Sequence, residues 1–147
     1  MILFQIINSR SLVSDLCDYA CDINPKTMKS ESIITTKSFQ FALKIVRANQ
    51  LIIRSNKDNV LSKQLFRSGT SIGANVVESG GAYSKKDFEF KLSIAYKEAR
   101  ETAYWLKLIE ANDLLGKDEL SDLHDGVEEL QRLIGSAIIT LRRNATK

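Results

Sequence analysis

Apolar residues recur at steps of three, four and seven from Thr36 onward, and this spacing predicts long amphipathic helices. The first helix is expected to start near Thr36, with Thr36 or Ser38 as its N-cap, and to end at the polar run 55–59. Two adjoining apolar stripes are expected on it: Phe39, Ala42, Val46 and Ile53, and beside them Phe41, Ile45, Ala48 and Ile52.

A second helix is expected over 60–80, although it contains the glycine-rich stretch SGTSIGANVVESGG at 68–81. The apolar period continues through that stretch, with Leu61, Leu65, Ile72 and Val76 at helical steps. Gly69 and Gly73 share one face, and each costs about 1 kcal/mol relative to alanine in a helix. A close approach of another backbone is the physical use of such a pair, because no Cβ separates the two chains.

The third and fourth helices are expected over 84–112 and from about Leu120 into the tail LRRNATK. Ser84, followed three residues later by Asp87, resembles a capping box. The expected core stripes are Phe88, Leu92, Ala95, Ala99, Leu106 and Ile109 on the third helix, and Leu120, Leu123, Val127, Leu130, Ile134, Ala137 and Leu141 on the fourth. Short connections make successive helices antiparallel, so the sequence predicts an all-α fold, an up-down-up-down four-helix bundle.

The chemistry of common enzymes is missing from this pattern. Gly69-x-x-x-Gly73 has neither the Walker lysine nor the order GxGxxG, and no strand precedes it. The serines of this stretch lack the spacing of a hydrolase elbow. His124 is the one histidine and no ExxH sequence exists, which argues against a di-metal carboxylate site. We therefore expect no catalytic residues, no metal and no cofactor.

Polar residues of the second and third helices form facing stripes that interrupt apolar rows. On the third helix, Glu98 and Glu101 lie between Phe90, Ile94, Trp105 and Leu108. A carboxylate among apolar neighbours needs partners, because an unpaired buried charge is costly. We expect a polar network between the two helices, or an interface between subunits, from these residues: Gln64, Arg67, Ser68, Gly69, Ser71, Gly73, Asn75, Glu78, Lys91, Glu98, Glu101 and Trp105. A ligand or nucleic-acid site, or an acid–base pair of Glu98 and Glu101, is the alternative.

The cations predict a basic pole at one end of the bundle. The start of the third helix and the end of the fourth meet there in an up-down-up-down arrangement. The candidate phosphate-binding residues are Lys85, Lys86, Arg142, Arg143 and Lys147. Ordinary solubilising charge is the alternative, since Arg142 and Arg143 also suit the dipole of a helix C-terminus.

Net charge, the length of apolar runs and the cysteine spacing limit the class of protein further. The 147 residues carry a formal net charge of +3, which permits an anionic partner without requiring one. No apolar run is long enough to span a bilayer, and Cys17 and Cys21 lack the spacing of a redox pair, so a cytoplasmic protein with reduced thiols is expected. Residues 1–34 are expected to be an N-terminal extension to a bundle domain over 35–147, with Met28 as the biological start; an arm that packs on a neighbour is the alternative.

One long segment carries a family resemblance. Residues 64–106 resemble the four-helix-bundle proteins encoded by intervening sequences of bacterial 23S ribosomal RNA genes. The similarity extends over about 33–143 and does not include 1–27. The residues that carry it are Gln64, Arg67, Ser68, Ser71, Ile72, Asn75, Glu78, Ser84, Asp87, Phe88, Lys91, Leu92, Glu98, Glu101, Trp105 and Leu106.

The resemblance implies a bundle that assembles as a homopentamer and has no known catalytic activity. The similar accessory variability protein of diversity-generating retroelements is a basic pentameric bundle that binds nucleic acid and a reverse transcriptase. The charge of +3 is smaller than expected of that relative, which argues against a reverse-transcriptase partner. The sequence thus favours a non-enzymatic homo-oligomer that binds RNA or DNA through the basic pole, with a protein scaffold as the alternative.

Overall fold

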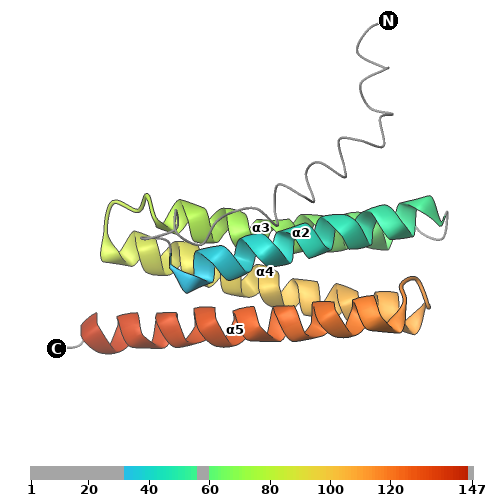
Figure 1. Ribbon diagram of the computed structural model, residues 1–147. Helices are drawn as coiled ribbons and strands as arrows, with labels where there is room; N and C mark the ends of the chain where they lie inside the picture. Colours follow the sequence, from blue (N-terminus) through green and yellow to red (C-terminus); the bar gives the residue numbers. More distant parts are fainter. Residues whose placement is uncertain (1–31, 56–59, 146–147) are drawn as a thin grey trace, which may run out of the picture. The chain divides into compact units, whose positions relative to one another are not determined.

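The computed structural model describes residues 32–55 and 60–145, with side chains for 32–55 and 60–143. Four helices occupy these ranges: α2 at Ile33–Arg54, α3 at Val60–Ser79, α4 at Lys85–Ala111 and α5 at Lys117–Ala145 (Figure 1). The all-α prediction is confirmed, and no strand occurs in the described ranges. Met28, both cysteines and Lys147 lie outside the described residues, as does nearly all of the expected extension.

The helix starts are set by side chains that cap free backbone N–H groups. For α2, Ser32 Oγ accepts from Thr35 N at 3.3 Å, so the expectation of Thr36 or Ser38 as N-cap is wrong. Ser38 is instead buried and donates to Thr35 O at 2.9 Å. The cap predicted for α4 is confirmed, since Ser84 Oγ accepts from Asp87 N at 3.1 Å. The Asp87 carboxylate accepts from Tyr83 N at 3.2 Å, one residue before the partner that a regular capping box uses.

The glycine-rich stretch is helical, as predicted, because α3 runs without interruption from Val60 to Ser79. Its two inner glycines face α2 within the same chain. A Cβ on Gly69 would lie 2.7 Å from Ile45 Cγ1, and a Cβ on Gly73 would lie 3.5 Å from Ser38 O. The expected approach of another backbone therefore occurs at Gly73, whereas Gly69 makes room for the Ile45 side chain of the same chain.

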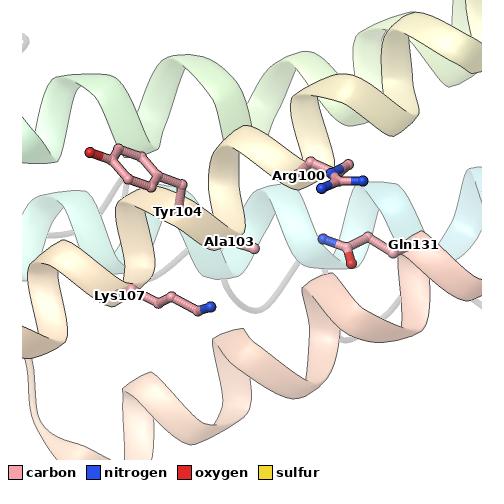
Figure 2. Close-up of a pocket in the computed structure, with 5 residues that line it drawn as sticks. All are labelled: Arg100, Ala103, Tyr104, Lys107 and Gln131. Carbon is pink, nitrogen blue, oxygen red and sulfur yellow. The ribbon is translucent and has the colours of Figure 1, made fainter.

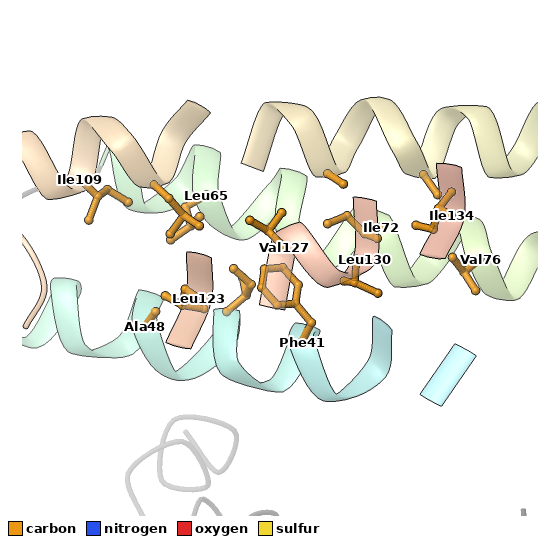
Figure 3. Close-up of a cluster of buried hydrophobic side chains, with 14 of the residues drawn as sticks. Phe41, Ala48, Leu65, Ile72, Val76, Ile109, Leu123, Val127, Leu130 and Ile134 are labelled. Atoms are coloured by element: carbon orange, nitrogen blue, oxygen red, sulfur yellow. The ribbon is translucent and has the colours of Figure 1, made fainter. Parts of the chain in front are cut away.

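The core lies along the axis between the helices (Figure 3). On α2 the buried stripe is Phe41, Ile45, Ala48 and Ile52, whereas Phe39 and Ile53 of the adjoining stripe are 53% and 46% exposed. The predicted stripes of α3, α4 and α5 supply most of the remaining buried apolar residues: Leu65, Ile72, Val76, Leu92, Ala95, Ala99, Leu106, Ile109, Leu120, Leu123, Val127, Leu130 and Ile134, with Ile138 in addition.

Cross-helix pairs show how the helices run. Lys37 pairs with Glu129 and Lys44 pairs with Asp122. Residue numbers therefore rise along α2 where they fall along α5, so the two helices are antiparallel. The pairs Arg67–Glu101 and Glu78–Lys91 give the same relation for α3 and α4. Each helix contacts the two helices beside it, in the order α2, α3, α4, α5 and back to α2. These relations are those of an up-down-up-down bundle. None of the described helices combines the length and hydrophobicity needed to cross a bilayer.

Candidate nucleic-acid interface and helix-pairing network

A polar network joins α3 to α4, as the facing stripes predicted. Arg67 Nη2 lies 2.6 Å from Glu101 Oε1, and the same oxygen accepts from Trp105 Nε1 at 3.1 Å. About three turns further along α3, Lys91 Nζ lies 2.6 Å from Glu78 Oε2. The carboxylate of Glu101 therefore connects an arginine of one helix to the indole of the other.

A buried hydroxyl pair lies beneath these ion pairs. Thr102 Oγ1 is 3.0 Å from Ser68 Oγ, and both residues are fully buried. Thr102 was not predicted as a member of the polar network, because this residue lies in the core stripe of α4, between Ala99 and Leu106. A polar residue in an otherwise apolar stripe was the available signal, since buried polar groups require hydrogen-bond partners.

Other predicted members of the network remain within α3. Ser71 Oγ donates to Arg67 O at 2.7 Å and Asn75 Nδ2 donates to Ser71 O at 2.9 Å. Gln64 enters only through its backbone carbonyl, which accepts from Ser68 Oγ at 3.0 Å. Among the described hydrogen bonds, the Ser71 and Asn75 side chains bond to backbone carbonyls of α3 and do not reach α4.

Glu98 is the one predicted carboxylate left without a partner among the described residues, because its Oε2 is buried and accepts no hydrogen bond there. Burial raises the pKa of Glu98 above its ordinary value of 4.5, and the neighbouring Glu101 charge raises it further, while Arg67 lowers it. The described residues contain no group of three or more His, Cys, Asp or Glu side chains that could hold a metal ion.

The basic pole forms where α4 begins and α5 ends. Lys85 and Lys86 are exposed on the first turn of α4, and Arg142 and Arg143 are exposed on the last turn of α5. Arg142 Nε lies 2.7 Å from Glu89 Oε1 of α4, which brings the two helix ends together and neutralises part of the charge. Lys147 lies outside the described residues.

A groove between α4 and α5 was not predicted. It has a volume of about 240 Å³ and is lined by Arg100, Ala103, Tyr104, Lys107 and Gln131 (Figure 2). Arg100 and Lys107 make no ion pair among the described residues. The groove between α2 and α5 differs, because its lysines, Lys37 and Lys44, are paired with carboxylates.

The comparisons with known proteins agree with this fold. The sequence pattern of the family described as 23S rRNA-intervening sequence protein matches residues 30–136. Among solved structures, the chain is similar to a protein of unknown function from the S23 ribosomal protein family of Bacteroides thetaiotaomicron VPI-5482, with 40% identity and a TM-score of 0.70. That similarity covers 72% of this chain and 98% of the other. The search of curated proteins found no match.

Proposed function

The chain belongs to the family of 23S rRNA-intervening sequence proteins, and from that premise we propose that it is a non-enzymatic, homo-oligomeric bundle that binds RNA or DNA through its basic pole. The observation that carries this proposal is the meeting of Lys85 and Lys86 with Arg142 and Arg143 at one end of the bundle. Lysine and arginine side chains gathered at one site bind phosphates and release the counterions around them.

Charge reversal at this pole tests the proposal. The variant Lys85→Glu/Lys86→Glu changes two exposed residues in the first turn of α4, where acidic residues suit the helix dipole. The matched control, Lys63→Glu/Lys117→Glu, changes two exposed lysines at the first turns of α3 and α5, which lie at the opposite pole. Both variants lower the net charge equally, from +3 to −1, because each reversal removes two units.

The pole variant is expected to lose binding to structured RNA and duplex DNA, measured by fluorescence anisotropy, whereas the control keeps most of its binding. Circular dichroism is expected to give the same helix content for both variants. Equal losses in the two variants would show that net charge alone acts and would remove the pole from the proposal.

Self-association is supported by apolar side chains that one chain leaves uncovered. Phe39, Val46 and Ile53 are seven residues apart on α2, with Phe39 and Ile53 about half exposed. On α3, Phe66 and Val77 are 40% and 64% exposed. Large exposed apolar side chains are candidates for covering by another protein chain where they gather into patches. We propose a homopentamer, as the family resemblance implies, and place it in the cytoplasm because its cysteines lack the spacing of a redox pair.

A protein scaffold without nucleic-acid contact is the second candidate, and the same apolar rows favour it. Sedimentation measures the size of the assembly independently of nucleic-acid binding. The variant Phe39→Asp/Ile53→Asp is expected to sediment as a smaller species if the α2 row lies in the oligomer contact. An unchanged assembly would exclude that row from the contact between copies.

A further inference from the structure

Resting on the proposed function, we infer that the groove between α4 and α5 is a second nucleic-acid contact, which binds single-stranded RNA or DNA. In this site Arg100 and Lys107 bind backbone phosphates, and a base stacks on Tyr104. All three residues line the groove and are exposed (Figure 2).

The groove belongs to a longer basic row on α4. Positions 86, 93, 97, 100, 104 and 107 follow helical steps of seven, four, three, four and three, so they share one face. Its residues are Lys86, Ser93, Lys97, Arg100, Tyr104 and Lys107. At 1.5 Å per residue the row extends about 32 Å from the basic pole into the groove. A strand bound at the pole can therefore continue along α4.

Two of the carboxylates near this row bind arginines, and Glu110, one turn beyond Lys107, lies 3.3 Å from His124 Nε2. Glu89 falls between Lys86 and Ser93, where it binds Arg142. Glu101 binds Arg67 on the other side of α4. Glu128 is exposed on α5, one turn before Gln131, and makes no ion pair among the described residues. Arg100 and Lys107 thus keep their charge available for an anionic ligand.

The aromatic ring in the groove is held by its neighbours. Tyr104 is 56% exposed, and its ring meets that of Trp105 edge to face, with 5.1 Å between centroids and 67° between planes. Trp105 in turn donates to Glu101, which binds Arg67. An exposed aromatic ring near cations is the kind of surface on which single-strand-binding proteins stack bases.

The opposite wall supplies a fixed polar group. Gln131 Nε2 donates to Ala99 O at 3.1 Å, which ties the side chain to α4. An amide NH₂ has two donors, so one N–H remains for a ligand. Cations, a stacking ring and a hydrogen-bond donor therefore line the same groove.

The test uses the full chain and a labelled RNA of about 12 uridines, within the length that one single-strand site covers. The variant Arg100→Ala/Lys107→Ala is expected to weaken binding about tenfold or more, and to lower the slope of log K against log salt by about 1.4, because two phosphate contacts are lost. The control Lys63→Ala/Lys117→Ala removes the same charge, from +3 to +1, and is expected to change the affinity less than about threefold.

Stacking is tested separately with Tyr104→Ala and Tyr104→Phe. The alanine variant is expected to bind about fivefold more weakly or worse, whereas the phenylalanine variant, which keeps the ring, binds as the parent does. Equal binding by the alanine variant and the parent would overturn the stacking role. Equal binding by the Arg100/Lys107 variant and its control would overturn the groove as a site.

The outcomes distinguish this inference from the function on which it rests. If the parent protein binds no nucleic acid, the proposed function fails and the groove fails with it. A second outcome is that the parent binds, that Lys85→Glu/Lys86→Glu abolishes this binding, and that the groove variants leave it unchanged. That outcome excludes only the groove as a binding site. Tighter binding to duplex than to single strands, with no effect of Tyr104→Ala, would overturn the assignment of a single-stranded ligand.

Discussion

Glu101 binds Arg67 across the contact between α3 and α4, with 2.6 Å between Oε1 and Nη2, and the same oxygen accepts the indole N–H of Trp105. One carboxylate thus sets both the pairing of two helices and the orientation of an aromatic residue. Trp105 contacts the Tyr104 ring of the α4–α5 groove, so the network on one side of α4 is connected to the groove on the other.

Replacing Glu101 with glutamine is expected to lower the free energy of unfolding by about 1 kcal/mol, because a partly exposed ion pair and one charge-assisted hydrogen bond are weakened. Urea denaturation measures this loss. The tryptophan emission of the folded protein is expected to shift as well, since Trp105 is the one tryptophan and its N–H loses a charged acceptor. Unchanged stability and emission would mean that the contact has no structural role.

Replacing Glu98 with glutamine is expected to raise the melting temperature at pH 7. The pKa of Glu98 is raised in the folded state, chiefly by burial and then by Glu101. Folding therefore favours the protonated acid: its stabilising contribution is complete below the unfolded value near 4.5 and is lost as the pH rises through the folded pKa. Glutamine resembles the protonated acid at every pH.

The advantage of Glu98→Gln should consequently shrink as the pH falls below about 4.5. Thermal melts of parent and variant between pH 4 and 7 measure this difference. A destabilised variant at pH 7 would contradict it, because that result requires the charged form of Glu98 to be stabilised in the fold.

The two helical glycines of α3 are expected to respond oppositely to alanine. In Gly69→Ala the new Cβ would lie 2.7 to 2.9 Å from three atoms of the buried Ile45 side chain, so that core residue must shift. This overpacking is expected to cost about 1–3 kcal/mol, more than the gain in helix propensity. In Gly73→Ala the nearest atom is 3.5 Å away, an ordinary contact, so the propensity gain of up to about 1 kcal/mol remains.

Chemical denaturation of both glycine variants measures this contrast, and each serves as the control for the other. Equal effects on stability would contradict the packing of α2 on α3 described above.

Removing the charge of Glu128 is expected to strengthen binding, whereas removing the cations of the groove is expected to weaken it. It is the exposed carboxylate of α5 one turn from Gln131, and it repels a phosphate in the groove. Glu128→Gln is therefore expected to tighten binding of single-stranded RNA about two- to fivefold at low salt, less as the salt is raised. Asp118→Asn, which removes an equal charge in the first turn of α5, is the matched control. Equal tightening by the control would indicate net charge alone.

The sequence predicted the helices and most of the core because both depend on local spacing. The period of apolar residues continued through Gly69 and Gly73, so α3 could be recognised in spite of its glycines. The N-cap of α2 was placed wrongly because several Ser and Thr residues precede Phe39, and the spacing alone does not select Ser32 among them. Which stripe of α2 is buried was equally open, since it depends on how the neighbouring helices approach.

Half of the polar network could be predicted, and the groove could not. Facing stripes pointed to Arg67, Glu101 and Trp105, but serine and asparagine can satisfy their own helix, as Ser71 and Asn75 do. The hydrogen bond between Thr102 and Ser68 could be predicted only if the register between α3 and α4 were known. The groove requires Gln131 of α5 to lie beside Arg100 of α4, a relation between residues that are 31 positions apart.

The central claim, that this bundle binds nucleic acid, is tested most directly by the salt dependence of binding. Fluorescence anisotropy of labelled single-stranded and structured RNA, and of duplex DNA, would be followed across salt concentrations, with the full chain and with protein that starts at Met28. Binding whose log–log slope against salt is about −3 or steeper, indicating several phosphate contacts, is predicted. Absence of binding to each of these at about 50 mM salt, where exposed charges are weakly screened, would contradict the account.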